Sequence, residues 1–381
     1  MTTTVWPGLR TLRRRVVMPR LNRPDWWLLI AAVGLVGLGV VMVFNASYFF
    51  ALERNGDGYL YFRKHLLSIA MGTVLAVGVS QLRVEVFERA ARPLLVAALI
   101  VLVCVLVPHI GLVRGGARRW IGVGSFSIQP SEWAKIVLVM YLASSIARRG
   151  EKMTSFVDGI LPHLIVVGAC AGLIVVEPDF GTAAILGLLL MAMMFAGGAR
   201  PLHLMLIALP GLLLASVAIL RAGYRMRRVM AFLDPWKYSQ DIAFQLVQSL
   251  IAFGSGGATG VGLGQSKQKL FFLPEAHTDF IFALVGEELG LLGVLVVLML
   301  FGLLGYRGFR VALRHPDRFA GLLAFGLTLV LMLEAVVNVG VVLGLLPTKG
   351  LALPFLSCGG SAMMVTLVQV GILAALSRQT G

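Results

Sequence analysis

The sequence predicts an all-α, polytopic membrane protein with about ten transmembrane helices and one large extracytoplasmic loop between helices seven and eight. Of its 381 residues, 58% are hydrophobic and only 13% are charged, and the mean hydropathy is +0.89. A soluble domain of this length carries far more charge, so most of the surface is expected to face lipid. Helices are predicted for the spans because backbone groups in lipid must form hydrogen bonds within their own segment.

Ten segments are mainly apolar, and most of them reach the roughly 20 residues that a helix needs to cross a hydrocarbon core. They lie near residues 26–45, 65–81, 93–108, 132–147, 160–176, 181–197, 203–220, 281–304, 320–343 and 357–376. We find no clear internal repeat and no second soluble domain. Residues 25–381 are therefore expected to form a single transmembrane domain.

The segment before the first span, residues 1–24, is basic. It contains Arg10, Arg13, Arg14, Arg15, Arg20 and Arg23. The positive-inside rule places this segment in the cytoplasm, and nine further spans without a convincing cleavage site favour an uncleaved first helix over a signal peptide. Ten spans return the C-terminus to the same side, where the basic residues near 83–92, 148–152 and 307–318 also fall. We expect a protein of the inner, cytoplasmic membrane with both termini in the cytoplasm.

Basic residues also occur on the predicted outer side, where they are disfavoured for insertion. They are Arg114, Arg118, Arg119, Arg221, Arg225, Arg227, Arg228, Lys237, Lys267 and Lys269. Either a group on that side needs positive charge, or the loop face is simply solvated, since long loops translocate largely regardless of charge. The net charge of +15 indicates an anionic partner, and for an integral membrane chain an anionic lipid fits better than nucleic acid.

The large loop spans residues 222–278 and has mixed composition. It holds the sequence FLDPW at 232–236, an amphipathic stretch near 245–248 and a glycine-rich run from 254 to 264. Long loops in compact proteins are usually functional or disordered, and this composition predicts short helices at the membrane surface. The glycine run lacks the preceding strand, the following helix and the downstream acidic residue of a dinucleotide-binding motif, so we exclude that function.

Cysteine and histidine spacing gives no sign of a metal centre. The three cysteines, Cys104, Cys170 and Cys358, lie far apart in the chain, and the six histidines are scattered without a His-x-x-x-His pair. Neither a disulfide framework nor a metal site built only from protein ligands is expected.

An acidic residue, Asp279, stands where the large loop enters span eight. Thr278 is predicted as the helix N-cap, and Asp279 would lie in the first turn, where the helix dipole favours an anion. That role alone would explain the residue. Its position at a membrane mouth beside a polar, basic loop favours a functional site. Glu287 would lie about 12 Å further along the helix, so Asp279 is expected to act alone or with a group from another helix.

A second unusual segment leads into span four. Pro130 fits the first helical position, Glu132 falls in the dipole-favoured first turn, and Lys135 can pair with Glu132 on one face. The pair either holds the helix in place or belongs to a functional site, and the cost of charges within a bilayer favours the second interpretation. Asp179 is a predicted N-cap for span six. Glu334 and Asn338 are one turn apart in span nine, as a polar strip expected to serve helix packing.

Taken together, these segments resemble the SEDS family, which includes FtsW and RodA. The matching stretches are GARRWIGVGSFSIQPSEWAK (116–135), EPDFGTA (177–183), FLDPW (232–236), LPEAHTDFIFALVGEELG (273–290) and GLLPTKGLALPFLSCGGSA (344–362). The sequence PTKG at 347–350 resembles the FtsW branch. Three departures are Cys358 where the family usually has Tyr, Gly115 for a common Asn, and Glu177 for the more usual Gln.

The resemblance implies polymerisation of lipid II on the outer face of the cytoplasmic membrane, with Asp279 matching the family's catalytic acidic residue. A carboxylate near the acceptor sugar hydroxyl can act as general base, and positive charge can stabilise the departing polyprenyl pyrophosphate. Arg118, Arg119 and Lys135 are the candidates for that charge, with Mg²⁺ or Mn²⁺ sharing the task and no organic cofactor. The matched motifs supply the other substrate-binding candidates, which are Trp120, Glu132, Asp179, His277, Glu287 and Lys349.

The resemblance also implies partners. We expect a class B penicillin-binding transpeptidase, whose single transmembrane helix would pack on spans eight and nine, and other divisome membrane proteins. No nucleic acid is expected.

Two alternative functions stay open. A lipid II flippase would need a polar path open alternately to both faces, whereas the polar residues here cluster on the outer side. A non-catalytic divisome scaffold would have no need for an acidic residue at the membrane mouth.

Overall fold

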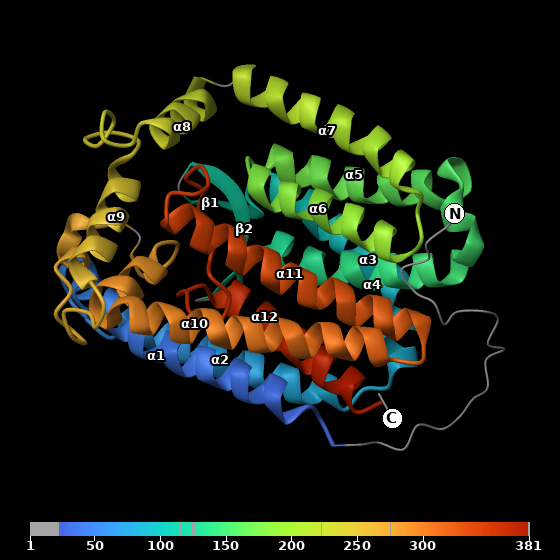
Figure 1. The fold of residues 1–381 in the computed structure, drawn as a ribbon, viewed down its shortest axis with the longest axis horizontal. Coiled ribbons are helices and arrows are strands. Elements are labelled where there is room, and N and C mark those ends of the chain that lie inside the picture. Colours follow the sequence, from blue (N-terminus) through green and yellow to red (C-terminus); the bar gives the residue numbers. More distant parts are fainter. Residues whose placement is uncertain (1–22, 115, 124–125, 222, 275, 380–381) are drawn as a thin grey trace.

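The computed structural model describes residues 23–114, 116–123, 126–221, 223–274 and 276–379. Within these ranges, a helix coincides with each of the ten predicted spans (Figure 1). They are α1 (Trp26–Asn55), α2 (Leu60–Ser80), α3 (Val84–Leu106), α4 (Pro130–Arg149), α5 (Leu161–Val176), α6 (Phe180–Ala196), α7 (Pro201–Arg221), α10 (Ile281–Arg314), α11 (Arg318–Val342) and α12 (Gly360–Ser377). The predicted helical, polytopic fold is confirmed. Residues 1–22 of the basic N-terminal segment lie outside the described ranges.

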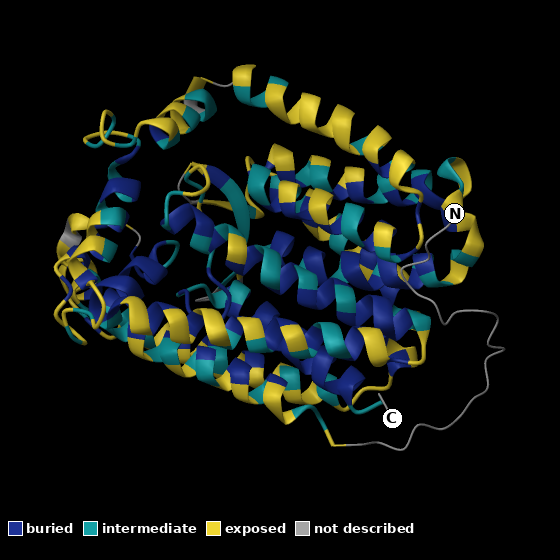
Figure 2. Cartoon of the chain, viewed as in Figure 1, coloured by how far each residue is buried: buried dark blue, intermediate teal, exposed yellow. Residues whose placement is uncertain are grey.

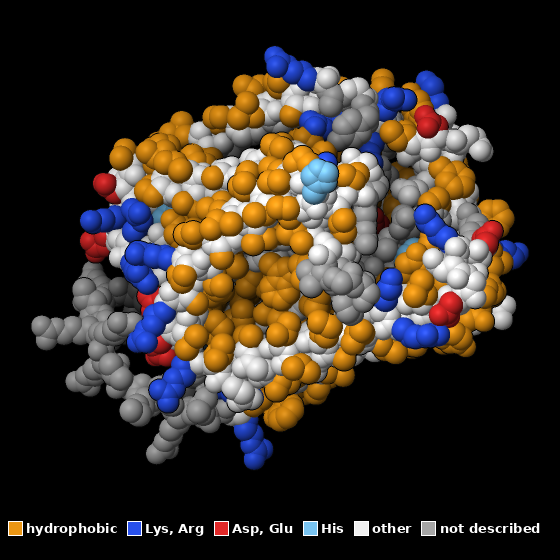
Figure 3. Space-filling view, turned by 180° about the vertical axis from the view of Figure 1, so that it is seen from behind, with side chains coloured by type: hydrophobic (Ala, Val, Ile, Leu, Met, Phe, Trp, Pro, Cys, Tyr) orange, Lys and Arg blue, Asp and Glu red, His pale blue; other side chains and the backbone are white. Residues whose placement is uncertain are grey.

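Eight helices of the described chain are long and apolar enough to cross a membrane. One of the eight is the continuous helix Phe156–Val176, in which a π-helical turn at Phe156–Ile160 precedes α5. The remaining two predicted spans are α6, which has 17 residues, and α4, whose first and last turns carry charged residues. Hydrophobic side chains cover much of the back face of the molecule (Figure 3). A soluble monomer rarely exposes large contiguous apolar patches, so this surface indicates a bundle that faces lipid.

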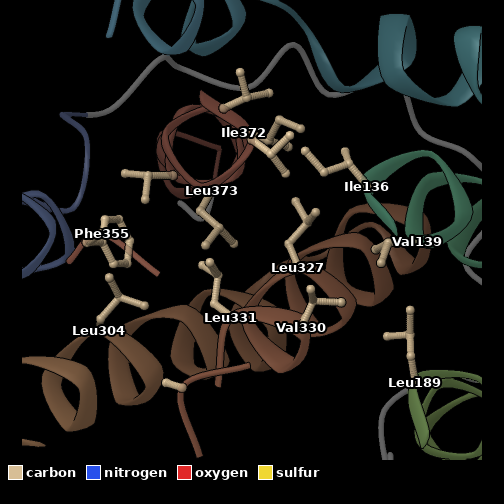
Figure 4. Packing of buried hydrophobic residues seen from close by; sticks show 14 of the residues in the cluster. Ile136, Val139, Leu189, Leu304, Leu327, Val330, Leu331, Phe355, Ile372 and Leu373 are labelled. Atoms are coloured by element: carbon tan, nitrogen blue, oxygen red, sulfur yellow. The ribbon is translucent and has the colours of Figure 1, made fainter. Parts of the chain in front are cut away.

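The core of the bundle is built on α11 and α12, which are largely buried, whereas α7 is largely exposed (Figure 2). Leu331 of α11 faces Leu373 of α12, and Leu327 and Val139 complete the contact with α4 (Figure 4). All four side chains are fully buried. Between helices in lipid, close packing rather than removal from water supplies the stabilisation.

The large loop contains the short helices that its composition predicts, α8 (Gly223–Leu233) and α9 (Phe244–Gly256), followed by a π-helical turn at Gln268–Phe272. Its glycine-rich run folds back onto α10. Val261 N donates to the Glu287 carbonyl, and Leu291 N donates to the Gly257 carbonyl, both at 3.0 Å. These bonds join the loop to α10 on either side of Gly290, where the helix is interrupted.

Glycine is required at that break. Gly290 has φ of 64°, in the left-handed region that other residues avoid. A Cβ at this position would overlap the Gly260 backbone nitrogen and lie 2.7 Å from the Ala258 carbonyl oxygen. The loop backbone therefore packs directly against the helix backbone.

Two features differ from the sequence-based expectation. A small antiparallel sheet of order β1-β2-β3 stands between α3 and α4, formed by β1 (Gly111–Arg114), β2 (Ala117–Val123) and β3 (Phe126–Ile128). The predicted N-cap at Thr278 is wrong, because α10 begins at Ile281, and its N-cap residue, Phe280, makes no side-chain capping bond. Asp279 therefore lies in the turn before the helix.

Candidate active site

A cavity of about 340 Å³ lies at the end of the bundle that carries α8 and α9. Three segments form it: the α8–α9 region, the turn before α10, and the loop of residues 343–359 between α11 and α12. The lining residues are Arg228, Asp241, Ile242, Phe244, Gln245, Pro274, Asp279, Phe280, Thr348, Lys349 and Gly350. Of the residues selected from the sequence, this cavity brings together Asp279 and Lys349.

The backbone of Asp279 is held from the α11–α12 side. The carbonyls of His277, Thr278 and Asp279 accept hydrogen bonds from Cys358 N at 2.9 Å, Ser357 Oγ at 2.5 Å and Asn338 Nδ2 at 2.9 Å. These three consecutive bonds fix the turn in place of a helix cap.

The carboxylate of Asp279 lies close to Gly350. A Cβ added to Gly350 would come within 2.7 Å of Asp279 Oδ2. Gly350 follows Lys349 directly, so the two loops that carry the acidic and the basic group meet at this glycine. The close approach explains why a residue without a side chain stands here.

Lys349 lines the cavity together with a second cation, Arg228. Its Nζ is buried and has no hydrogen-bond partner among the described residues. It lies against the start of α6, where a Cβ at Gly181 would overlap it. Burial lowers the pKa of Lys349 to about 8, and the nearby carboxylates, Asp179 foremost, oppose that shift. The amine therefore stays largely protonated at neutral pH.

Lys135 lies in a buried ion cluster instead of in the cavity. Its Nζ donates to Glu132 Oε1 at 2.8 Å, so the predicted pair on α4 is confirmed, and also to Glu334 Oε1 of α11. Only 1% of the Lys135 side chain is exposed. Glu334 thus serves helix packing, as expected, but it does so through an ion pair.

Arg118 and Arg119, the other two cations selected for the leaving group, are bound to backbone carbonyls. Arg118 donates to the Leu106 carbonyl at 3.1 Å. Arg119 donates to the carbonyls of Glu177 at 2.8 Å and Pro178 at 2.5 Å, and thereby joins β2 to the turn between α5 and α6. Neither residue lines the cavity. Trp120 also lies outside its lining, opposite Leu112 in the sheet.

The turn before α6 contains two carboxylates with different roles. Asp179 accepts from Thr182 N at 3.1 Å and from Thr182 Oγ1 at 2.8 Å, so the predicted N-cap is confirmed. Glu177 is fully buried, and its carboxylate oxygens have no hydrogen-bond partner among the described residues. Burial, reinforced by Asp179, raises the pKa of Glu177 to about 8, while Arg119 opposes the shift.

His277 and Glu287 lie outside the cavity lining. The His277 ring packs against the rings of Phe50 and Tyr61, with centroid distances of 5.0 and 5.3 Å. Glu287 accepts from Ser266 Oγ and from Lys267 N, the latter at 3.0 Å. Glu287 thus holds the end of the large loop on α10.

The sequence analysis missed several residues of the site. Arg228 lines the cavity and donates to the Thr348 carbonyl at 3.3 Å; the only signal for it was the set of basic residues in the loop. Asp241 and Gln245 line it from the α8–α9 region. Gln245 belongs to the amphipathic stretch near 245–248, but nothing in the local sequence marks either residue as part of a site, because their relevance comes from how the loop folds.

No three His, Cys, Asp or Glu residues in the described part of the chain gather as a metal-binding group. The lining residues thus offer two carboxylates, Asp241 and Asp279, without a third ligand of these types. The fit to a resident metal ion is poor.

The family model described as cell cycle protein, which covers FtsW, RodA and SpoVE, matches residues 26–381. The chain belongs to the SEDS family. As a SEDS protein it is a multi-pass membrane protein, in agreement with its eight long apolar helices.

SEDS relatives resemble the chain over almost its full length. It is 41% identical over 366 residues to the probable peptidoglycan glycosyltransferase FtsW of Geobacter metallireducens, covering 96% of this chain and 98% of that protein. It is 39% identical over 355 residues to stage V sporulation protein E of Bacillus subtilis, covering 93% and 97% of the two chains.

Solved SEDS structures share the fold. The chain superposes with a TM-score of 0.77, at 30% identity, on a chain of a peptidoglycan synthase complex, covering 93% of this chain and 98% of that one. For the rod shape determining protein RodA of Thermus thermophilus the TM-score is 0.69, at 28% identity, with 93% and 97% covered. The SEDS fold predicted from the sequence is confirmed.

Proposed function

We propose that this chain, a peptidoglycan glycosyltransferase of the SEDS family, polymerises lipid II into glycan strands on the outer face of the cytoplasmic membrane. Its similarity to proteins named probable peptidoglycan glycosyltransferase FtsW supports the class of reaction. The observation that carries the proposal is that one cavity is lined by both Asp279 and Lys349, whose ammonium group is buried without a hydrogen-bond partner among the described residues. The reaction needs both kinds of group, a base for the acceptor and a cation for the leaving group.

Asp279 is the proposed general base. The acceptor sugar's 4-hydroxyl attacks the anomeric carbon of the donor and loses its proton to the carboxylate, while the bond from that carbon to the pyrophosphate oxygen breaks. The three bonds to the carbonyls of residues 277–279 hold the backbone of the turn that carries the carboxylate. A helix-capping role does not account for Asp279, because the helix begins at Ile281.

The departing polyprenyl pyrophosphate needs positive charge where its negative charge develops. Among the cations selected from the sequence, Lys349 lines the cavity, and Arg228 joins it there. We therefore assign contact with the pyrophosphate to Lys349 and Arg228. Arg118, Arg119 and Lys135 act on the substrate indirectly, since none of them lines the cavity and each donates to a carbonyl or a carboxylate.

A divalent cation, Mg²⁺ or Mn²⁺, would be held mainly by the pyrophosphate oxygens of the substrate, because the lining residues supply few ligands. When bound, it would add positive charge at the leaving group. No step of the proposed mechanism depends on it, and no organic cofactor is proposed.

Membrane orientation and partners complete the proposal. The cavity faces the outside, with both termini in the cytoplasm. The chain's similarity to a subunit of a peptidoglycan synthase complex supports a class B penicillin-binding transpeptidase as partner. Its transmembrane helix is expected on α10, where Leu291, Leu292 and Met299 are exposed, more than on α11, most of which is buried. The resemblance to FtsW supports a role in septal division.

Reconstitution tests this function against a flippase and a scaffold. The purified protein, alone and with its co-purified transpeptidase, is given lipid II in liposomes, and both glycan products and transbilayer movement of lipid II are measured. We expect glycan strands. Transbilayer movement without polymer would support a flippase, and the absence of both activities in both preparations would support a scaffold; either result contradicts the proposal.

A further inference from the structure

Asn338 of α11 joins the two segments that carry Asp279 and Lys349. Its Nδ2 donates to the Asp279 carbonyl oxygen at 2.9 Å and to the Leu351 carbonyl oxygen at 2.5 Å. Leu351 lies two residues after Lys349. One side-chain amide carries two N–H donors, so a single group serves both segments.

The side chain at position 338 must supply two hydrogen-bond donors. Both of its partners are carbonyl oxygens, which only accept hydrogen bonds, and the residue is 1% exposed, so water cannot replace it. A carboxylate would offer no donor when ionised, and an aliphatic side chain offers none. Loss of the amide would leave both carbonyls without this partner, which is unfavourable for groups that water does not reach freely.

The neighbouring bonds support this connection at a greater distance from the two groups. Ser357 Oγ donates to the Thr278 carbonyl and accepts from Leu353 N at 2.7 Å, so it also links the turn to the loop that carries Lys349. Cys358 N donates to the His277 carbonyl. The Asn338 amide bonds to Asp279 itself and to Leu351, which is nearer to Lys349 in the chain than Leu353 is.

The helix that presents Asn338 is itself anchored. Glu334 lies one turn earlier on α11 and is bonded to Lys135 of α4. Lys135 is also bonded to Glu132. This buried ion cluster fixes α11 against α4, and it thereby fixes the position of the Asn338 amide relative to α4.

We propose that Asn338 is a positioning residue for glycosyl transfer, which sets the separation of Asp279 and Lys349. This rests on the proposed function, in which those two groups act on the acceptor hydroxyl and the pyrophosphate. A displacement of about 1 Å in a reacting group can lower the rate by roughly 10²-fold. Asn338 does not line the cavity, so its loss is expected to lower kcat and to leave KM almost unchanged.

Two substitutions distinguish the effect of the hydrogen-bond donors from the effect of side-chain packing. Asn338→Leu fills the space without donors, and Asn338→Gln keeps the amide. Thr328→Val, a buried polar-to-apolar change on the same helix whose hydroxyl bonds within α11, is the control. We expect kcat to fall about 10²-fold in Asn338→Leu with KM within about twofold, to recover at least tenfold in Asn338→Gln, and to stay near wild type in the control. Rates are measured well below the lowest melting temperature of the set.

A wild-type kcat in Asn338→Leu, or equal losses in the Leu and Gln variants, would overturn the proposal. Should Asn338→Leu not fold, Asn338→Asp replaces it, since it keeps the shape but offers at most one donor; near-wild-type kcat there overturns the proposal equally. Asp279→Asn is assayed in parallel. An active Asp279→Asn protein would remove the proposed function, whereas an inactive one beside an unimpaired Asn338→Leu removes only the role of Asn338.

Discussion

Lys349 must be protonated to stabilise the departing pyrophosphate. Its pKa is lowered to about 8 by burial and by Lys135, while Asp179, Glu334 and Glu132 raise it. The protonated form is lost as the pH rises through that value, so glycan formation by the wild type is expected to decline above about pH 8. Lys349→Arg keeps its charge, because the guanidinium pKa exceeds 12, and should shift this decline to higher pH.

Lys349→Met removes the charge at similar size and should lower the rate by about 10²–10³-fold at every pH, as expected when one donor to developing negative charge is lost. Lys237→Met, at an exposed lysine of the large loop that does not line the cavity, is the control and should stay active. Initial rates of glycan formation from neutral to alkaline pH provide the measurement. A Met variant with the wild-type rate, or an unshifted decline in the Arg variant, would contradict the assignment.

Residue types and positions predicted only part of the site. Asp279 and the Asp179 cap stood out because polar groups at membrane mouths and helix starts follow simple rules, whereas Lys349 was selected only through the family resemblance. Thr278 was wrongly predicted as a cap, since Ser357 and Asn338, which hold this turn, are distant in sequence.

At the scale of elements, the ion cluster that joins α4 to α11 contains two carboxylates, Glu132 and Glu334, and one ammonium group, Lys135. Lys135→Ala leaves Glu132 and Glu334 buried without their cation, and breaking such a buried pair costs roughly 3–5 kcal/mol. Glu132→Ala leaves the Lys135–Glu334 pair intact and should cost less. The double variant still buries Glu334, so recovery should require Glu334→Gln as well. Melting temperatures in detergent check this order, and equal losses in the two single variants would count against the cluster.

The contact between the glycine-rich run and α10 can be tested by replacing two glycines of α10, one at a time, with Ala. Gly290→Ala would force a Cβ against the loop backbone at positive φ, and overpacking alone costs about 1–3 kcal/mol. Gly302→Ala meets open space and should be neutral or gain roughly 0.5–1 kcal/mol. Melting temperature and proteolysis of the loop report the outcome. A Gly290→Ala protein as stable as Gly302→Ala would refute the close contact.

The helices were predictable because each apolar run is long enough to dominate its surroundings. The ends of the helices were harder to predict. The helix α10 continues to Arg314, past the predicted end near 304, because charged residues can extend a helix beyond its apolar run. The sheet was missed because its strands have only three to seven residues. Its stability comes from the pairing of strands, which no single segment reveals.

For the whole molecule, composition and the order of motifs predicted a lipid-facing bundle of the SEDS family. The cavity itself was not predictable in that way. Arg228, Asp279 and Lys349 come from three segments separated by tens of residues. Arg228 of α8 reaches the α11–α12 loop, where it donates to the Thr348 carbonyl. Only the tertiary structure selects Lys349 and Arg228 over the other outer-side cations.

The central claim is that Asp279 accepts the proton of the attacking sugar hydroxyl, and Asp279→Asn tests it most directly. The amide keeps the size of the side chain but cannot take up a proton, so folding and transpeptidase binding should persist. Glycan formation from lipid II by the purified variant should fall by at least the roughly 10²–10⁴-fold that general-base catalysis contributes. A folded, partner-bound Asp279→Asn protein that polymerises lipid II at the wild-type rate would contradict the account.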